Sequence, residues 1–397
     1  MANYIDPYDP IYYAQEGLQL LENALGMATR VHRGFNEERK SFNRGDTMTI
    51  KKPSSFTTQA GGTSTLLDLN TSTVDLVVDN WRQVRFGLTD QELSKTGPEI
   101  ITDHIQPAVY ALANYIETQL TAEYANIPWS YDIAATPTAA DIIDCRKVLR
   151  DNAGSVLDQR ELVHFGIDSY LEAKFLNLSL FHDASVTGGD KNADVLFNGS
   201  LGTRFGVEHF VQQTLSDHTS GTVISATTDL AGALVATHSI RSTTISVDGL
   251  SGVETLTAGD SFVIAGNTQR YSVTALATLA GGANTAVAIY PALVEEYDDN
   301  AVVTFETISA TNWADRYYYN LMFHRNAIAI ALAPLPEIGD EAGARMSVVT
   351  DPRTHLSMRA RLAYDDSSAS VKVTLDVLFG TKTIDPNLAV VARRNYA

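Results

Sequence analysis

The last fifty residues place the strongest constraint on what this chain can fold into. Apolar and polar side chains alternate from Met358 to Leu362 and again from Val371 to Phe379, on either side of the polar turn 365–368. A period of two along the chain predicts two half-buried strands joined by a turn. No histidine or cysteine follows the second run, so we interpret this tail as the closing part of a sheet without a chemical role.

Length and cysteine content set the scale of the fold. With 397 residues, 44% of them hydrophobic, the chain is long enough for two or three domains, each with its own core. The single cysteine, Cys145, cannot form an intramolecular disulfide, and its helix-like setting favours a buried structural thiol over a nucleophile. No apolar run approaches the roughly twenty residues of a membrane span, and no signal-peptide pattern is present, which predicts a cytoplasmic protein.

The charge of the chain is acidic but unevenly spread. A net charge of -18 argues against a stable complex with nucleic acid, because that affinity comes mostly from Lys and Arg that neutralise phosphates. Residues 30–52 nevertheless contain seven basic residues against three acidic ones, a balance of +4. The seven are Arg30, Arg33, Arg39, Lys40, Arg44, Lys51 and Lys52. One end of the chain is therefore basic within an acidic whole.

The N-terminal region begins with a helical pattern and then becomes extended. Apolar residues at spacings of three, four and seven predict a helix with one apolar stripe over 11–29, which we interpret as an N-terminal arm. From 46 to 86 the pattern consists of two extended pieces, separated by the flexible GGTST and broken by Pro53. Two strands joined by a long loop are expected to protrude as a hairpin.

The longest helical signal of the sequence lies between Pro98 and Ile127, where apolar residues recur every three or four positions. We expect a long spine helix there. Pro107 falls inside the pattern and removes one backbone hydrogen bond, so we expect a kink or a helix that begins only a turn earlier. Pro128 is expected to end it.

The middle of the chain combines helices and strands. Thr138 is a candidate cap for a helix over 139–152, and ELVHFGI at 161–167 has the character of a buried strand. SYLEAKFL continues in helical register, and the glycine-rich stretch 186–206 is interpreted as an exposed loop followed by a strand. A helix followed by a strand indicates an α/β layer.

Composition changes sharply near Thr222. From Val223 to Thr311 there is no Lys, and two Arg stand against nine acids, in a background of Thr, Ala, Val and Gly. Short alternating runs recur every ten to fifteen residues between turn residues, which predicts a small antiparallel barrel or sandwich. Because α/β sequence lies on both sides, this β domain is expected to be an insertion. The apolar block 320–336 is expected to be the strand or helix that returns the chain.

No catalytic or phosphate-binding motif and no zinc-type histidine spacing occurs in the sequence. His164 is interpreted as a hydrogen-bonded core residue, and the glycines of GSLGTRFG as a turn. Four clustered acids leave three possibilities open: a solvated loop, a site for a hard cation such as calcium, or an interface that meets basic residues of a neighbouring subunit. These acids are Glu295, Glu296, Asp298 and Asp299.

Three stretches together resemble a known family. They are PAVYALANYIETQL at 107–120, NLMFHRNAIAIALAPLP at 320–336 and VTLDVLFGTKTIDPNLAVV at 373–391. With the order of the expected elements, they resemble the major capsid proteins of tailed bacteriophages, which have the Hong Kong 97-type fold. More narrowly, the chain is similar to the short-tailed phage coat proteins that carry an inserted β-barrel domain. The resemblance implies an α+β fold.

The resemblance also implies a division of the chain. Residues 1–45 would be the N-terminal arm and 46–86 the E-loop hairpin. The peripheral domain with the spine helix would comprise 87–130 and 345–397. The axial domain would comprise 131–222 and 312–344, and 223–311 would be the inserted barrel.

The function implied is that of a structural protein, not an enzyme, with no cofactor and no metal. Many copies would form the hexamers and pentamers of an icosahedral shell around packaged double-stranded DNA. The implied partners are a scaffolding protein, a portal protein and possibly a decoration protein, with only weak non-specific proximity to DNA and no membrane. The protein would be in the host cytoplasm before assembly and in the virion capsid afterwards. The basic arm segment is expected to contact the scaffold or an acidic neighbour rather than DNA.

Alternatives remain at this point. Some relatives join subunits by Lys to Asn isopeptide bonds, for which Lys51 or Lys52 is suitably placed, although the insertion-bearing branch is not expected to cross-link. The main competing function is that of a carbohydrate-binding or adhesive phage structural protein, whose Thr-rich β insert would be the binding module. An enzyme with an unrecognised site is a further alternative.

Overall fold

The computed structural model describes residues 10–33, 47–51, 73–89, 91, 99–134, 136–153, 162–182, 199–215, 217–225, 231–250, 253–281, 283–306, 316–337, 344–351 and 356–395. The chain forms two compact units, the first made of 1–116 with 329–384 and the second of 117–328 with 385–397. The chain passes from the first unit to the second within helix α3 (Glu99–Ala122), returns within strand β18 (Ile328–Leu332), and leaves again after Ile384.

The first unit is built on a five-stranded sheet. The order is β18-β21-β20-β19, and β3 pairs with β21 as well. Strands β20 (Ser357–Asp365) and β21 (Ser370–Thr383) are the pair expected from the alternating tail, and the turn between them is where the sequence predicted it. β19 (Ala344–Thr350) and β3 (Asn80–Thr89) complete the sheet.

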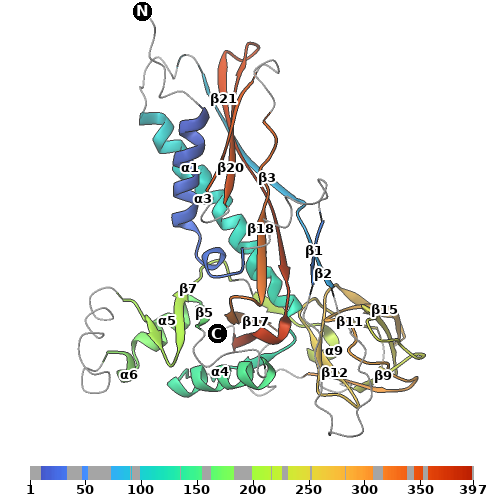
Figure 1. Cartoon of the computed structure of the whole chain (residues 1–397). Helices are drawn as coiled ribbons and strands as arrows, with labels where there is room; N and C mark the ends of the chain where they lie inside the picture. The colour runs from blue at the N-terminus through green and yellow to red at the C-terminus, as the bar shows by residue number, and fades with distance from the viewer. Residues whose placement is uncertain are drawn as a thin grey trace, which may run out of the picture. The chain divides into compact units, whose positions relative to one another are not determined.

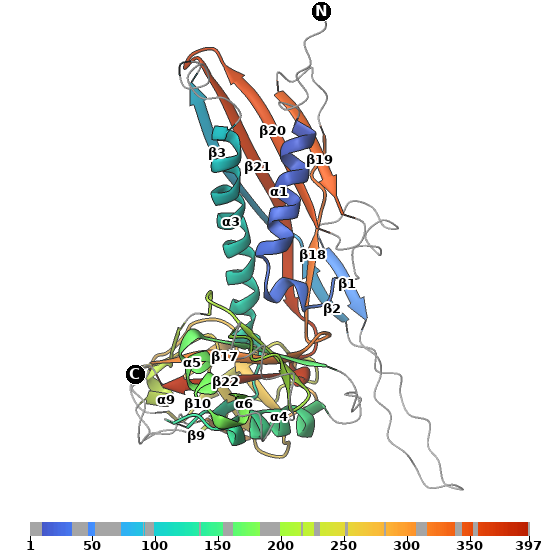
Figure 2. The same ribbon diagram turned by 90° about the vertical axis from the view of Figure 1, so that its left-hand side faces the viewer.

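Two helices lie along one face of this sheet, as Figures 1 and 2 show from two sides. Helix α1 (Pro10–Ala24) packs against β19 and β20, and it buries Leu18 and Leu21. Both expected helices are present, although α1 ends at Ala24 and only the short turn η2 (Met27–Thr29) follows within the expected range 11–29. α3 begins at Glu99 and contains Pro107 in its interior, so of the two alternatives a start only a turn before this proline is wrong, and the kink stays a prediction.

A separate two-stranded hairpin belongs to the same unit. β1 (Thr47–Lys51) pairs antiparallel with β2 (Thr73–Val77), and the linking residues lie outside the described ones. Its buried side chains pack with the segment around β18 in one core, which comprises Met48, Ile50, Leu76, Val78, Ala329, Ala331, Ala333 and Ile384. Gly380 permits this packing, because a Cβ atom there would lie 2.0 Å from the Val77 carbonyl oxygen.

The second unit contains a seven-stranded sheet in the order β4-β22-β17-β5-β7-β6, with β8 paired to β17. Its strands are β4 (Ser130–Asp132), β5 (Val163–Ile167), β6 (Thr203–Arg204), β7 (Val207–Val211), β8 (Asp217–Thr219), β17 (Arg316–His324) and β22 (Ala389–Asn395). Helix α4 (Ala139–Ala153) packs on β4, β22 and β17. Helices α5 (Ser169–Leu176) and α6 (Ser179–His182) follow β5.

The last strand departs from a simple sheet-closing tail. β21 lies in the first unit, but after the turn η8 (Pro386–Leu388) the chain continues into β22 in the second unit. β22 pairs with β17 on one side and, in parallel, with β4 on the other. The C-terminal residues therefore contribute to both units.

The expected antiparallel β insertion is a closed barrel. Its strand order is β10-β15-β13-β12-β16-β9. The strands are β9 (Ala231–Leu234), β10 (Thr244–Asp248), β12 (Ser261–Ile264), β13 (Arg270–Val273), β15 (Asn284–Tyr290) and β16 (Val302–Phe305). β11 (Glu254–Leu256) and β14 (Ala277–Leu279) form a small additional ribbon. The α+β class with an inserted antiparallel barrel is thus confirmed.

The barrel leaves and rejoins the seven-stranded sheet at adjacent strands. The chain enters it through β8 and the short helix α9 (Thr222–Ser225), and it returns into β17. β8 and β17 pair directly, with Thr219 opposite Arg316. The two ends of the insertion therefore meet in one antiparallel pair.

Candidate functional site

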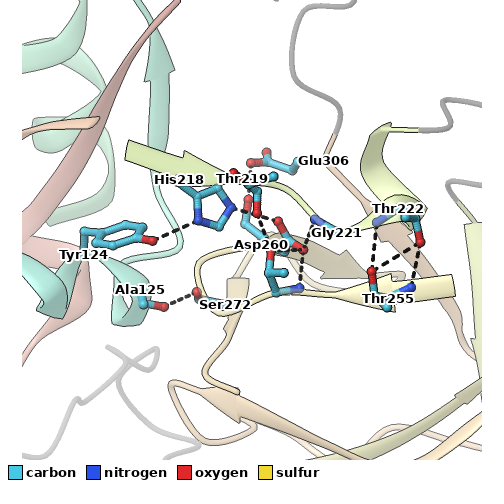
Figure 3. Close-up of polar contacts among 12 residues, drawn as sticks. Tyr124, Ala125, His218, Thr219, Gly221, Thr222, Thr255, Asp260, Ser272 and Glu306 are labelled. Atoms are coloured by element: carbon cyan, nitrogen blue, oxygen red, sulfur yellow. Dashed lines mark hydrogen bonds and ion pairs between the residues drawn. The ribbon is translucent and has the colours of Figure 1, made fainter. Parts of the chain in front are cut away.

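A buried polar network joins the barrel to the rest of the second unit (Figure 3). Tyr124 comes from the turn η5 (Glu123–Asn126) that ends α3, His218 from β8, and Asp260 from the residue before β12. Tyr124 Oη lies 2.9 Å from His218 Nδ1, and His218 Nε2 lies 3.2 Å from Asp260 Oδ1. Both His218 and Asp260 are almost fully buried.

Asp260 is the centre of the network. Its Oδ2 atom accepts hydrogen bonds from the backbone N–H of Gly221 at 3.0 Å and of Thr257 at 2.7 Å, and from the Thr257 hydroxyl at 3.2 Å. A buried carboxylate is costly unless hydrogen bonds compensate the loss of water. These donors, with His218, supply that compensation and fix the segment entering the barrel against the turn between β11 and β12.

The direction of the hydrogen bonds follows from the Asp260 carboxylate, which can only accept. In the neutral imidazole of His218 the proton therefore lies on Nε2, facing Asp260, and Nδ1 accepts from the Tyr124 hydroxyl. Burial, with a smaller contribution from nearby Tyr319, raises the pKa of Tyr124 well above its ordinary value, so the phenol retains the proton that it donates. The Tyr124 ring stacks on Tyr319 with a centroid distance of 3.7 Å. The arrangement is a closed relay that holds elements together rather than a reactive centre.

A second group of contacts lies beside the first and is centred on Glu306, which follows β16. Glu306 pairs with Arg270 at 2.6 Å and accepts hydrogen bonds from Ser261 at 2.7 Å and Ser130 at 3.3 Å. The Arg270 guanidinium lies 5.2 Å from the ring centre of Trp129. Ser130 and Trp129 belong to the body of the unit and the others to the barrel, so this group also spans the junction.

Two glycines make the junction possible. A Cβ atom on Gly221 would lie 2.2 Å from the Thr255 carbonyl oxygen and 2.7 Å from Leu256 Cα. Gly259 has a φ of +104°, and a Cβ atom there would lie 2.9 Å from the Tyr124 ring. Any larger residue at Gly221 must displace backbone, while one at Gly259 is strained in its own conformation.

The first unit contains a second buried charge cluster, on the face of its sheet opposite the helices. Asp376 of β21 is fully buried and pairs with Arg359 and Arg361 of β20, in each case at 2.7 Å. Arg361 also donates to Gln83 Oε1 at 2.7 Å, and the Arg359 guanidinium lies 5.9 Å from the ring centre of Trp81. The cluster ties β3, β20 and β21 together.

The arginines of the C-terminal strand hold β22 in the second unit. Arg393 pairs with Asp132 of β4 at 2.6 Å. Arg394 pairs with Asp168, the cap of α5. Its guanidinium lies between two rings, 4.4 Å from Tyr170 and 4.6 Å from Tyr318. The end of the chain is thus fixed by ion pairs as well as by the sheet.

The structure describes only part of the basic segment expected to contact partners. Arg30 is half-buried and donates to the Gly26 carbonyl oxygen at 2.9 Å, Arg33 is half-buried, and Lys51 is exposed at the end of β1. Arg39, Lys40, Arg44 and Lys52 lie outside the described residues, and so do the linking residues of the hairpin. Their predicted role as contact residues stays a prediction.

The four clustered acids form a fixed loop on the barrel. Glu295 accepts a hydrogen bond from Asn267 at 2.9 Å, and Asp299 accepts one from the Ala236 N–H at 2.8 Å. Tyr297, between them, is buried, and its hydroxyl lies 3.1 Å from that of Tyr271. Within the described part of the chain, no group of three His, Cys, Asp or Glu side chains could hold a metal ion.

Other single residues agree with the sequence analysis. Cys145 is buried in α4, and desolvation raises its pKa well above the ordinary value, so its thiol is held neutral. His164 is hydrogen-bonded to Glu208 at 2.8 Å. Gly199, Gly202 and Gly206 all have positive φ angles, as a turn requires. No helix among the described residues is long and apolar enough to cross a membrane.

The junction network could not be predicted from the sequence. Tyr124, His218 and Asp260 lie 94 and 42 positions apart, and no motif connects them. One local signal was available: Asp260 follows Gly259 directly before the barrel strand β12. A glycine followed by an acid at a turn is too common to identify a buried hub.

Comparison with known proteins gives likeness in fold only. No protein-family model matches the chain, and no curated protein matches it significantly. Among solved structures, that of Mycobacterium phage Che8 is 12% identical with a TM-score of 0.48, covering 91% of this chain and 88% of that chain. The capsid of cyanophage P-SCSP1u is 10% identical, with a TM-score of 0.46 and coverages of 93% and 87%.

The mature capsid of bacteriophage PhiM1 is likewise 10% identical, with a TM-score of 0.44, and the match covers 89% of this chain and 84% of that chain. At these identities and scores the likenesses concern the fold and say nothing of activity. In fold, the chain is similar to bacteriophage capsid proteins.

Proposed function

We propose that this chain is a major capsid protein, of which many copies assemble into an icosahedral shell enclosing packaged double-stranded DNA. The supporting observation is the combination of elements in one chain. The hairpin β1–β2 pairs separately from the five-stranded sheet, and the helices α1 and α3 lie along only one face of that sheet. A closed barrel is inserted between the paired strands β8 and β17. A closed container needs one chain to make several different contacts with its neighbours, and such appendages supply them.

The parts of the chain receive roles within this proposal. Residues 1–45 are the arm. Residues 46–86 contain the hairpin that reaches a neighbour and, from Asn80, the first part of β3, which lies in the main sheet. The peripheral domain comprises 87–130 and 345–397, the axial domain 131–222 and 312–344, and the inserted barrel 223–311. Hexamers and pentamers of the chain form the shell.

Charge supports a container rather than a DNA-binding protein. A net charge of -18 disfavours tight binding of phosphates, so a duplex entering the shell meets little resistance from the wall. The proposed partners are a scaffolding protein and a portal protein. The chain is proposed to occupy the host cytoplasm before assembly and the virion capsid afterwards.

No chemical step is part of the proposal. The buried acids at the centres of the two networks, Asp260 and Asp376, have their oxygens occupied by donors of the chain itself. Such groups stabilise a fold and are not available to a substrate. The protein is therefore proposed to act by assembly alone, without a cofactor.

The proposal is tested by expressing the full chain alone and together with a scaffolding protein. Sedimentation and negative-stain electron microscopy are expected to show shells or tubes. A protein that remains monomeric under every condition would contradict the proposal, and binding of that monomer to glycans would favour the adhesive alternative.

The basic arm is tested separately by reversing Arg33, Arg39 and Lys40 to Glu. We expect scaffold-directed assembly to fall strongly, because the acidic partner loses its counter-charges. Lys147→Glu with Lys174→Glu is the control, since both lysines are exposed on helices of the second unit. Normal scaffold-directed assembly of the arm variant would exclude the arm as the contact.

A further inference from the structure

The sheet of the first unit has one face that no described helix covers. In the register of β20, β21 and β3, Arg359, Asp376 and Gln83 lie side by side, and the next row on the same face contains Arg361, Thr374 and Arg85. Residues directly opposite in neighbouring strands share a face. The alternate residues face the helices, since Phe379 contacts Tyr115 of α3 with ring centres 6.0 Å apart. We use the name open face for the side away from the helices. It comprises the two rows just named together with Trp81 and Lys372.

The open face is basic within an acidic chain. It contains Arg85, Arg359, Arg361 and Lys372 against Asp376, Asp365 and Glu337, which is four minus three, or +1; Glu337 is included because it follows Pro336, whose carbonyl oxygen accepts from Arg359. Arg85 is exposed, and among the described residues it has no ion-pair partner. Arg361 keeps 27% of its side chain exposed although it pairs with Asp376. Positive charge therefore remains available at the surface.

The side chains of this face are held in place before any partner arrives. Asp376 is fully buried and fixes both Arg359 and Arg361, and Gln83 fixes Arg361 from the other side. Trp81 is 54% exposed beside Arg359. Exposed aromatic and arginine side chains on a rigid surface are typical of protein interfaces, because little conformational entropy is lost when they bind.

The complementary charge is found on the barrel. The described residues from 231 to 306 contain two arginines and eight acids, namely Asp248, Glu254, Asp260, Glu295, Glu296, Asp298, Asp299 and Glu306. Three of them, Glu296, Asp298 and Asp299, are exposed in one loop. Buried Tyr297 and the hydrogen bonds to Asn267 and Ala236 hold this loop in a fixed conformation.

We propose that the open face is an interface between copies of this chain and that it receives the acidic loop 295–299 of a second copy. This inference rests on the proposed function, in which many copies meet. Chains with a net charge of -18 repel one another, so a stable contact must place the minority basic surface of one copy against an acidic surface of the next. The open face and the acidic loop are such a pair, and both are preorganised.

Charge exchange tests the contact directly. Arg85→Glu with Lys372→Glu is expected to lower the rate and yield of assembly roughly tenfold, through repulsion from the acidic loop. Glu296→Lys with Asp298→Lys is expected to have a similar effect. The four substitutions together restore opposite charges across the contact, so assembly is expected to return toward that of the unmodified protein. Thermal unfolding of each variant shows whether it is folded.

The matched control is Lys147→Glu with Lys174→Glu, which changes the net charge by the same amount at exposed sites of the second unit. If the open-face variant assembles no worse than this control, or if the exchange variant fails to recover, the proposed interface is wrong. Shells of the unmodified protein in that experiment would leave the capsid function standing. A failure of the unmodified protein to assemble at all would instead overturn the function and the interface together.

Chemical cross-linking provides an independent readout. The only natural cysteine, Cys145, is buried, so thiols introduced by Arg85→Cys and Asp298→Cys react alone. Assembled particles of this variant, treated with a short bismaleimide, are expected to give a ladder of multimers on a denaturing gel. Lys147→Cys with Asp298→Cys is the control and should give monomers. Monomers from both variants would overturn the interface.

Discussion

Arg359 and Asp376 lie directly opposite each other in the register of β20 and β21, and both guanidinium Nε and Nη2 donate to one carboxylate oxygen, at 3.0 and 2.7 Å. Asp376 is fully buried, and Arg359 is 6% exposed. The central strands of the first unit are thus joined by a desolvated ion pair as well as by backbone hydrogen bonds. Such a pair matters most when one partner is removed, because the other charge is then left buried without compensation.

Asp376→Asn is therefore expected to lower the free energy of unfolding by about 3 kcal/mol, since it leaves Arg359 and Arg361 without their counter-charge. Denaturant unfolding monitored by fluorescence measures the change. Asp366→Asn, in the exposed turn after β20, is the control and should change stability by less than about 0.5 kcal/mol. Equal effects of the two substitutions would show that the buried pair contributes no specific stability.

Gly221→Ala is expected to destabilise the second unit by about 2 to 3 kcal/mol, because the new methyl group would meet the backbone of Thr255 and Leu256, which cannot yield as a side chain can. Gly87→Ala on β3 is the matched control. The nearest atom to a Cβ there is 3.9 Å away, so the substitution should be tolerated. A Gly221→Ala protein with unchanged unfolding would mean that the junction adapts more freely than the structure indicates.

Asp260→Asn is expected to loosen the attachment of the barrel and to cost about 2 kcal/mol, because an amide cannot accept on both sides as the carboxylate does. The sharpest measurement is hydrogen exchange. The amides of Gly221 and Thr257 donate to this carboxylate and should exchange faster in the variant. Asp248→Asn on β10 should leave both rates unchanged, and unaltered protection in the Asp260 variant would remove Asp260 from the centre of the network.

His209 of β7 makes stability depend on pH. Burial among Phe165, Phe175 and Phe181 lowers its pKa from 6.5 to about 4, although hydrogen bonds to Gly202 and Val207 oppose this shift. A histidine with a lowered folded pKa contributes stability above pH 6.5 that is lost as the pH falls toward 4, where the unfolded chain binds the proton more readily. The loss amounts to about 3 kcal/mol.

The measurement is chemical denaturation at pH 7.5, 5.5 and 4, compared between the natural protein and His209→Phe. Carboxylates affect both proteins alike, so the difference between the two curves isolates the histidine. We expect the stability of the variant to fall less over this interval. Parallel curves would show that His209 titrates normally in the folded protein.

Elements with strong local periodicity could be predicted from the sequence. The spine helix, the pair β20 and β21, and the barrel runs that became β10, β12, β13, β15 and β16 all lie where the pattern placed them. Each has a regular period of 3.6 or 2 over enough residues to outweigh competing signals. β9 (AGAL) contains no polar side chain and so shows no alternation, and the ribbon strands β11 and β14 are only three residues long each.

Pairings between distant segments were beyond sequence reasoning. Nothing in Ala389–Asn395 indicates that this strand joins a different sheet from β21, since only residues 384–388 separate the two strands. The helix also continues through Pro107, because packing on the sheet outweighs one lost hydrogen bond. The hub at Asp260 depends on three segments that meet only in the folded chain.

The pairing of Thr219 with Arg316 places the two ends of the inserted barrel side by side. Because β8 and β17 are paired, the sheet already holds the two ends of the insertion together. The pairing therefore offsets most of the entropy cost of closing the insertion as a loop. A tight two-residue turn could stand in the same place without changing the order of the surrounding strands. The order of the strands in the seven-stranded sheet therefore does not depend on the inserted module.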